Sequence, residues 1–190
     1  MDNQLAKKPV VGSLAQVANQ TGHAIAETFI SADVIVIVDT SSSMASHDNS
    51  ELSRYERACD ELAKIQASMP GKIAVISFSD DVIFCPSGIP WNYSSGTDLA
   101  KALKFCRVAD VPDMKFILIS DGEPNDERSA LDEAAKYKNP ISTIYIGPAG
   151  GYGEKFLAKL AQKTAGKSAV DFSAHQLETT MKGLLSDGKL

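Results

Sequence analysis

The sequence predicts an α/β fold with a Rossmann-like, doubly wound and mostly parallel sheet, one antiparallel edge strand and helices on both faces. Uninterrupted runs of branched apolar residues, of which Val34–Val38 is the clearest, are typical of central strands buried on both faces. Longer segments between these runs carry apolar residues at helical spacing. Strands that alternate with helices of this length favour a parallel sheet that is covered on both sides.

The first half of the predicted sheet contains three strands. The first strand is Asp33–Val38. Glu51–Met69 is predicted as a helix, because its apolar residues fall near helical spacing and a Pro-Gly pair follows it. Lys72–Phe78 is a second apolar strand. A turn of Ser and Asp residues connects it to the short strand Val82–Cys85, so this pair is predicted as a hairpin at the sheet edge.

Capping and stop signals delimit the remaining elements. Thr97 or Asp98 can cap one helix and Asn125 or Asp126 the next, since such side chains accept hydrogen bonds from free amides at a helix start. Pro140 ends the second of these helices. In order, we predict a helix Asp98–Val108, a strand Met114–Ser120, a helix from Asn125 or Asp126 to about Lys138, a strand Ile141–Ile146, a helix Glu154–Thr164, a strand Ala169–Phe172 and a helix Ala174–Leu185.

Length and composition indicate one globular domain. The 190 residues, 44% of them hydrophobic and 23% charged, predict a single domain at residues 31–190. Residues 1–30 form an N-terminal extension with a weak helical stripe, which we expect either to lie on the domain or to reach a partner. The net charge of −5, without a basic run, argues against nucleic acid or an anionic membrane as the main partner.

The cysteines and the N-terminus bear on cellular location. Three cysteines cannot form a complete disulfide framework, and we expect Cys59, Cys85 and Cys106 to be small core residues in a reducing compartment. The N-terminus lacks the clean apolar stretch of a signal peptide, and no segment is apolar over the length that a membrane span needs. The expectation is therefore a soluble, cytoplasmic protein.

Polar residues gather in loops at the ends of predicted elements. Asp39, Ser41 and Ser43 follow the first strand, Thr97 stands at the start of a helix, and Asp121 directly follows a later strand. Open α/β sheets bind ligands at the carboxyl ends of their strands, where the strand order reverses. Carboxylate and hydroxyl oxygens suit Mg²⁺, Mn²⁺ or Ca²⁺. We therefore expect a metal site where these loops converge.

These residues resemble the metal-ion-dependent adhesion site of the von Willebrand factor A-type domain, which integrin inserted domains share. That site combines an Asp-x-Ser-x-Ser loop with a distant Thr and a distant Asp, and all five positions are present here: Asp39, Ser41, Ser43, Thr97 and Asp121. The strand and helix order also fits, so the resemblance spans roughly residues 30–188. One departure is Ser42, where relatives often have Gly. A Ser fits there unless the backbone φ angle is positive.

The resemblance implies a role for each of the five residues. Ser41 and Ser43 would be direct ligands of the cation, and Thr97 would bind it directly or through water. The two carboxylates would act directly or through water and hold the hydroxyl groups in place. Family sites leave one coordination position for a carboxylate of the partner. Neutral hydroxyl ligands leave positive charge on the cation, which attracts an incoming Asp or Glu.

The function implied by this resemblance is a non-enzymatic, divalent-cation-dependent protein-binding module in an adhesion, scaffold or adaptor role. Intracellular relatives often serve as scaffolds in larger complexes or as adaptors for AAA+ ATPases. The alternative is an Mg²⁺-dependent phosphoryl-transfer hydrolase with Asp39 as nucleophile, although such enzymes carry a second aspartate where this chain has Ser41. No well-placed lysine completes such a site either, although Lys115 directly precedes the apolar run of one of the predicted strands. A structural domain with a vestigial metal site is the third reading.

Four residues near the predicted site are candidates for a partner-contact rim: Trp91, Tyr93, His47 and Glu123. Aromatic side chains favour protein contact, but the two aromatic residues are equally suited to core packing. His47 with Asp48 also fits a solvated turn, and Glu123 a solvated loop. The Asp80-Asp81 pair is better explained by a hairpin turn than by a second metal. The glycines between 147 and 153 form only an incomplete phosphate-binding motif.

Overall fold

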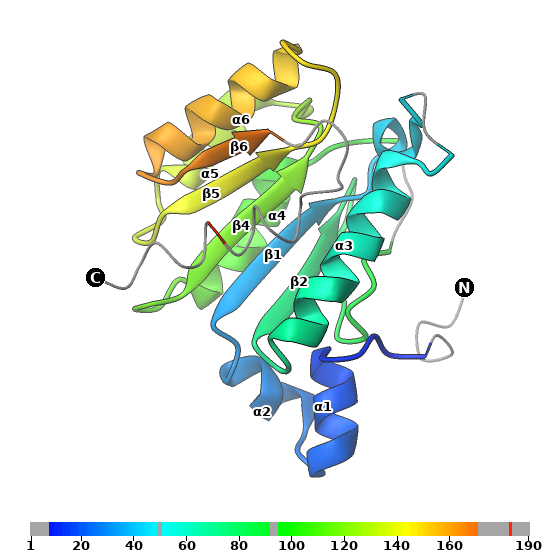
Figure 1. Cartoon of the computed structure of the whole chain (residues 1–190). Coiled ribbons are helices and arrows are strands. Elements are labelled where there is room, and N and C mark those ends of the chain that lie inside the picture. The colour runs from blue at the N-terminus through cyan, green and yellow to red at the C-terminus, as the bar shows by residue number, and fades with distance from the viewer. Residues whose placement is uncertain (1–7, 49–50, 92–94, 171–182, 184–190) are drawn as a thin grey trace.

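The computed structural model describes residues 8–48, 51–91, 95–170 and 183. Within these residues the chain forms a six-stranded sheet in the order β3-β2-β1-β4-β5-β6. Neighbouring strands run parallel except at one edge, where β3 is antiparallel to β2 (Figure 1). Helices cover both faces of the sheet, so the predicted fold class, including the edge hairpin, is confirmed.

The strands lie close to their predicted positions, because runs of buried apolar residues mark them in the sequence. Their bounds are β1 Val34–Asp39, β2 Ile73–Phe78, β3 Val82–Phe84, β4 Lys115–Ser120, β5 Ile141–Tyr145 and β6 Ser168–Val170. All residues of β1 and β2 are buried, as expected of strands with covered faces. The first strand includes Asp39 as its last residue, which places that carboxylate at the carboxyl edge of the sheet.

The helices match the predicted order with differences at their ends. They are α1 Leu14–Thr21, α2 Ile25–Ile30, α3 Arg54–Ser68, α4 Leu99–Cys106, α5 Glu127–Ala134 and α6 Tyr152–Lys163, with 3₁₀ turns η2 Ser42–Ala45 and η3 Arg107–Ala109. Asp98 caps α4 and Asp126 caps α5. The start predicted for α3 at residue 51 is wrong, because Ser53 accepts a hydrogen bond from the Glu56 amide and begins the helix there.

The predicted end of α5 near Lys138 is also wrong. The helix ends at Ala134. Beyond it, the amides of Lys138 and Asn139 donate to the side chain of Asp110, at 2.6 and 3.1 Å. These amides are therefore satisfied by a distant carboxylate instead of by the helix ladder. The helix predicted over Ala174–Leu185 lies outside the described residues apart from Gly183.

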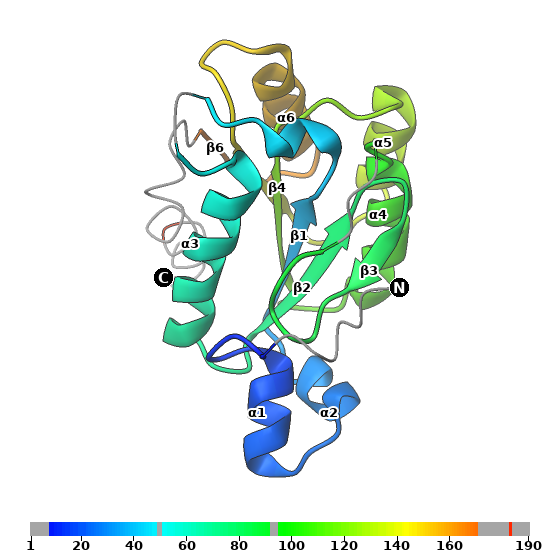
Figure 2. The ribbon, with the colours of Figure 1, turned by 90° about the vertical axis from the view of Figure 1, so that its right-hand side faces the viewer.

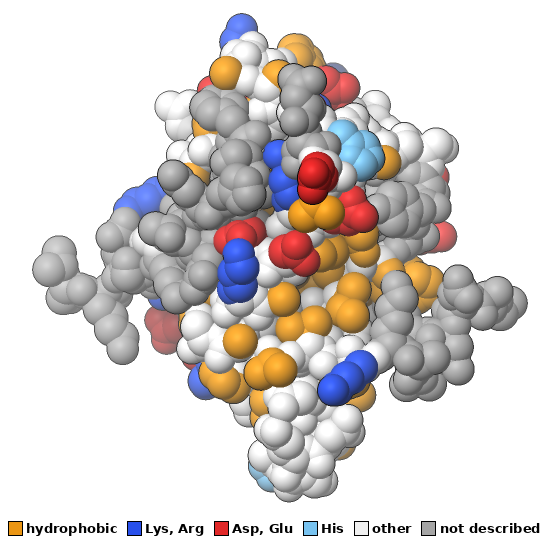
Figure 3. Space-filling model, turned by 45° about the vertical axis from the view of Figure 1, so that its right-hand side comes forward, with side chains coloured by type: hydrophobic (Ala, Val, Ile, Leu, Met, Phe, Trp, Pro, Cys, Tyr) orange, Lys and Arg blue, Asp and Glu red, His pale blue; other side chains and the backbone are white. Residues whose placement is uncertain are grey.

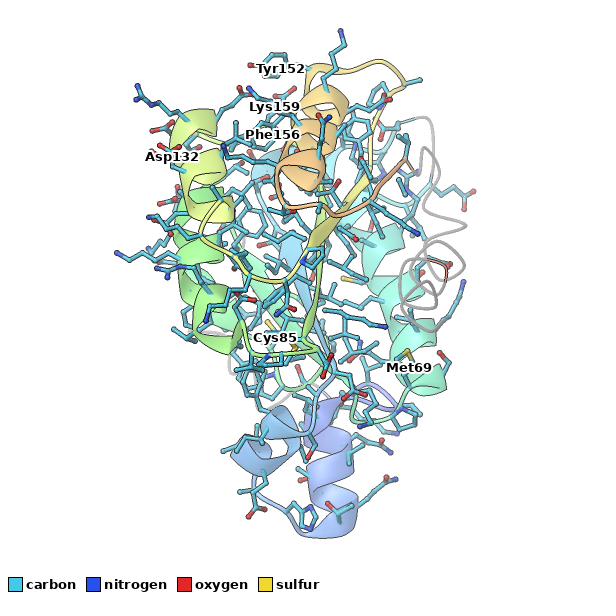
Figure 4. All side chains as sticks on the ribbon, turned by 90° about the vertical axis from the view of Figure 1, so that its left-hand side faces the viewer. Met69, Cys85, Asp132, Tyr152, Phe156 and Lys159 are labelled. Carbon is cyan, nitrogen blue, oxygen red and sulfur yellow. The ribbon has the colours of Figure 1, made fainter. Side chains whose placement is uncertain are left out.

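Helices lie on both sides of the sheet, with α3 on one side and α4 and α5 on the other (Figure 2), and an apolar cluster fills each side. On one face α3 packs against alternate residues of β1, β2 and β4, and on the other face α4, α5 and α6 pack against the intervening residues. Along α6, Phe156 is only 3% exposed whereas Tyr152 is 64% exposed, so one side of this helix meets the sheet (Figure 4). Strand side chains alternate between the two layers, which leaves the loops at the strand ends free to carry polar residues.

The N-terminal extension is attached to the domain. Leu14 is buried in the same apolar cluster as α4, and the Val10 amide donates to the Ser87 carbonyl at 2.9 Å. Gly22, with φ of +76°, ends α1 in the left-handed conformation and turns the chain into α2. Both helices lie at the end of the sheet opposite the carboxyl end of β1 (Figure 1). No helix of the described residues is long and apolar enough to cross a membrane.

Candidate metal centre

The strand order brings two of the three predicted loops together. β1 lies between β2 and β4, and the three strands are parallel. The loops after β1 and β4 therefore leave the same edge of the sheet side by side, at the point where the strand order reverses. These are the loops that carry Asp39, Ser41 and Ser43 on one side and Asp121 on the other.

Asp39 is the buried centre of this arrangement. Its side chain is 0% exposed, with Oδ1 accepting the Ser41 amide at 2.8 Å and Oδ2 accepting the Ser120 hydroxyl at 2.6 Å. Burial, and then the negative charge of Asp121, raise the pKa of the Asp39 carboxyl group from 3.8 to about 6. A positive charge near Asp39 and Asp121 would therefore reduce the repulsion between their two buried carboxylates.

The two serines of the first loop present their hydroxyl groups to each other. Ser41 is 1% exposed, and its Oγ lies 3.1 Å from Oγ of Ser43. The 3₁₀ turn that begins at Ser42 folds the loop, and fully buried Met44 anchors it to the core. Ser42 is not among the described non-glycine residues with positive φ. A Ser is therefore accommodated without backbone strain at this position, where relatives often have Gly.

Two reciprocal hydrogen bonds hold Thr97 against Asn125, in the loop that follows β4. The Thr97 amide donates to Oδ1 of Asn125 at 2.9 Å, and the Asn125 amide donates to the Thr97 carbonyl at 3.0 Å. Asn125 belongs to the same loop as Asp121, so the second loop is bound to the third. Thr97 is only 7% exposed. The second loop is thus bound to the third by hydrogen bonds, and the strand end before the third loop is bound to Asp39 through Ser120.

Asp121 has one satisfied and one unsatisfied oxygen. Oδ2 accepts from Nη1 of Arg54 at 3.1 Å, whereas buried Oδ1 has no hydrogen-bond partner among the described residues. A buried acceptor without a partner is costly, and a cation would satisfy it. No group of three or more His, Cys, Asp and Glu side chains forms a metal site within the described ranges, so a cation here depends on the hydroxyl groups. The residues present therefore fit a hard divalent cation.

A close contact between two glycines holds the Asp121 loop. Gly122 has φ of +78°, and a Cβ atom at Gly153 would lie 1.9 Å from the carbonyl oxygen of Asp121. Only glycine allows the start of α6 to approach the loop this closely. This contact accounts for one glycine of the sequence motif that resembled a phosphate cradle. Gly147 and Gly151 are required by a different neighbour, the hydroxyl group of Tyr145.

The proposed rim residues occupy varied positions. His47 is exposed and its Nδ1 lies 3.2 Å from the Glu51 carbonyl oxygen, and Glu123 is exposed as well. Trp91 is half-buried and packs against the apolar layer under α3. Tyr93 lies outside the described residues. The Asp80 region forms the expected turn, in which the Ser79 amide donates to the Asp81 carbonyl.

Three residues of the site, Ser120, Asn125 and Arg54, were not predicted from the sequence, and Asp48 was considered only as part of a turn beside His47. Ser120 and Asn125 hold the strand ends and loops together, and their proximity to Asp121 in the sequence was the available signal. Arg54 forms ion pairs with both Asp48 and Asp121, and the sequence carried no signal for the pair with Asp121, because 67 residues separate Arg54 from Asp121. Acidic and basic side chains lie next to one another on the upper part of the surface in Figure 3, whereas hydrophobic side chains gather across its middle.

Comparisons with known proteins bear on the fold. No family model and no curated protein matches the sequence. Among solved structures, an aerotolerance-related membrane protein from Bacteroides fragilis is 16% identical, with a TM-score of 0.63 over 81% of this chain and 98% of that chain. A von Willebrand factor type A protein from Catenulispora acidiphila is 14% identical, with a TM-score of 0.58 over 80% and 41%. The manganese-loaded TRAP protein of Plasmodium vivax is 16% identical, with a TM-score of 0.57 over 81% and 73%.

The chain therefore has the fold of the von Willebrand factor A domain, as the resemblance in the sequence predicted. The likeness to these structures concerns the fold. The assignment of metal ligands rests on the residues and contacts of this chain.

Proposed function

We propose that this chain is a non-enzymatic protein-binding module whose affinity for its partner depends on a divalent cation, Mg²⁺ or Mn²⁺ with Ca²⁺ as a further candidate. The residues that would hold the cation are Asp39, Ser41, Ser43, Thr97 and Asp121. The observation that carries the proposal is the buried, unpartnered Oδ1 of Asp121 beside a second buried carboxylate and two adjacent hydroxyl groups. The bound cation would supply a coordination position for a carboxylate oxygen of the partner.

The neutral ligands favour an anionic partner group. Ser41 and Ser43 carry no formal charge, and Arg54 already neutralises part of the charge of Asp121. A divalent cation in this site therefore keeps positive charge that an Asp or Glu side chain can neutralise. The TRAP structure is manganese-loaded, which supports divalent cation binding as a property of proteins with this fold. A role as scaffold or adaptor, including one for an AAA+ ATPase, is part of this proposal.

Two observations favour binding over catalysis. An Asp39 nucleophile would have to reach the phosphorus atom of a substrate, but its side chain is 0% exposed. Lys115, the lysine considered for a phosphoryl-transfer site, pairs with Val34 at the start of β1. It therefore lies at the opposite end of the strands from Asp39, too far to bind a phosphate there.

The location of the protein remains a proposal as well. We propose a reducing, cytoplasmic setting, supported by three free cysteines, of which Cys85 and Cys106 are buried. Fractionation of cells that express the tagged chain would test it. Recovery of the chain in the membrane or extracellular fraction would contradict it.

Calorimetry tests the metal, and a partner pull-down tests its role. Wild-type protein should bind one Mn²⁺ or Mg²⁺ ion, and Asp121→Ala should not. Asp132→Ala, which removes an exposed carboxylate on α5, is the matched control and should bind as the wild type does (Figure 4). A partner captured from lysate in Mg²⁺ should be lost in EDTA and with Asp121→Ala.

Three results would oppose the proposal. Absence of heat with every cation would indicate a vestigial site. Equal capture in Mg²⁺ and EDTA would exclude a metal bridge. Phosphatase turnover that Asp39→Asn abolishes would favour the hydrolase instead.

A further inference from the structure

Arg54 lies between the metal centre and a neighbouring loop. Its Nη1 donates to Oδ2 of Asp121 at 3.1 Å, while Nε and Nη2 donate to the two carboxylate oxygens of Asp48 at 2.5 and 2.7 Å. Its side chain is 10% exposed. The planar guanidinium thus binds one carboxylate with a two-pronged contact and a second carboxylate with its remaining nitrogen. One side chain therefore connects the loop after η2 to the loop after β4.

Local structure holds Arg54 in this position. It is the first residue of α3, and its amide donates to the Ser46 carbonyl at 2.8 Å. Ser46 therefore lies against the start of α3. Arg57, one turn further along the helix, also reaches Asp48, at 3.3 Å. The Arg54 guanidinium holds the pKa of the Asp48 carboxyl group below its ordinary value.

We propose that Arg54 sets the charge balance of the metal centre, lowering its affinity for the cation and raising the affinity of the loaded site for a partner carboxylate. This inference rests on the proposed function. Arg54 occupies Oδ2 of Asp121 and leaves Oδ1 available, so a cation and the guanidinium share the carboxylate. Arg54 would be a positioning residue, since it acts on the cation through Asp121.

The formal charges show the size of this effect. By formal charge, three carboxylates (Asp39, Asp48 and Asp121) and two guanidinium groups (Arg54 and Arg57) give the centre one net negative charge. A divalent cation makes it net positive, which attracts an anion. Without Arg54 the loaded centre would be neutral. It would hold the cation more tightly and attract a carboxylate less.

Three variants separate charge from orientation. Arg54→Gln removes a positive charge, Asp48→Asn removes a negative charge, and the double variant removes both and restores the net charge. Calorimetry at pH 8 measures the affinity for Mn²⁺ alone. Water-proton relaxation of the Mn²⁺-loaded protein then measures the binding of sodium acetate. Acetate that displaces a bound water lowers this relaxation. Thermal melting in EDTA establishes that each variant is folded.

The expected changes have opposite signs. Arg54→Gln should tighten Mn²⁺ binding by about tenfold. It should also raise, by about tenfold, the acetate concentration that produces half of the fall in water-proton relaxation. Asp48→Asn should shift both quantities in the reverse directions, and the double variant should return toward the wild type. If Arg54→Gln does not fold, Asp48→Asn carries the test alone, because its side chain is 21% exposed and lies in a loop.

Several results would overturn the inference. One is a weaker Mn²⁺ affinity in Arg54→Gln that the double variant does not restore, because this would mean that Arg54 only orients Asp121. Another is an equal Mn²⁺ affinity in all variants. Acetate that leaves the relaxation of the loaded wild type unchanged overturns it as well. In the first two cases the wild type still binds Mn²⁺ and acetate, so the proposed function stands, whereas loss of the acetate effect also counts against the proposed binding of a carboxylate. A wild type that binds no Mn²⁺ contradicts both.

Discussion

Replacement of Asp39 by Asn is expected to stabilise the metal-free protein at neutral pH. The Asp39 carboxyl group is fully buried, and its pKa is raised to about 6 by burial and then by the charge of Asp121. Ionised Asp39 therefore opposes folding. An amide has the same shape and no charge. It can accept the Ser41 amide through Oδ1 and donate through Nδ2 to the hydroxyl group of Ser120.

The size of the effect follows from the pKa shift. A rise from 3.8 to about 6 corresponds to about 3 kcal/mol, at about 1.4 kcal/mol for each pKa unit. Because the folded protein binds this proton more tightly than the unfolded chain, the stability due to Asp39 is present in full below pH 3.8. It is lost as pH rises through about 6. The advantage of Asp39→Asn should therefore be near zero at pH 4 and about 3 kcal/mol at pH 8.

Urea unfolding in EDTA across this pH range measures the difference directly. Asp132→Asn, an exposed site on α5, is the control and should differ little from the wild type at either pH. Addition of Mn²⁺ should raise the stability of the wild type and leave Asp39→Asn unchanged, since the amide cannot supply the charge. A variant that is less stable than the wild type at pH 8, or a difference independent of pH, would refute the reasoning.

Other substitutions test the supports of the site and the core. Gly153→Ala should lower the free energy of unfolding by about 1–3 kcal/mol and weaken Mn²⁺ binding, because its Cβ would meet the Asp121 carbonyl; unchanged calorimetry and urea curves would contradict this. Ser53→Ala should cost about 1 kcal/mol in urea unfolding through loss of the cap of α3, and no loss would mean that the cap is dispensable. Leu103→Ala, fully buried under the sheet, should cost about 2–5 kcal/mol, whereas exposed Lys104→Ala should change stability by less than about 0.5 kcal/mol; similar values for both would argue against this core.

Local signals explain why the order of the elements could be predicted. The buried strand Val34–Asp39 is an apolar run that no solvent-facing element would tolerate, and Asp98 and Asp126 cap their helices with side chains that the sequence shows. The predictions failed at two helix ends, the start of α3, where Ser53 caps the helix, and the end of α5. Beyond α5 the amides of Lys138 and Asn139 donate to the Asp110 carboxylate, and helical periodicity carries no information about that contact.

The metal centre divides in the same way. An Asp-x-Ser-x-Ser loop behind a buried strand is a local pattern, and the resemblance supplied Thr97 and Asp121 as its distant partners. The hydrogen bond from Ser120 to Asp39 could not be predicted, because it depends on β4 lying directly beside β1. Neither could the contact between Gly153 and the Asp121 loop.

The sequence by itself determined the fold class, the order of strands and helices, and the residue types at the edge of the sheet, because burial, capping and turn formation act over a few neighbouring residues. Only the tertiary structure decided how the charges of that edge are arranged. It placed Arg54 between Asp48 and Asp121, left Oδ1 of Asp121 without a partner and buried Asp39 beside it. Charges interact through space, so their balance depends on distances that the order of residues along the chain does not specify.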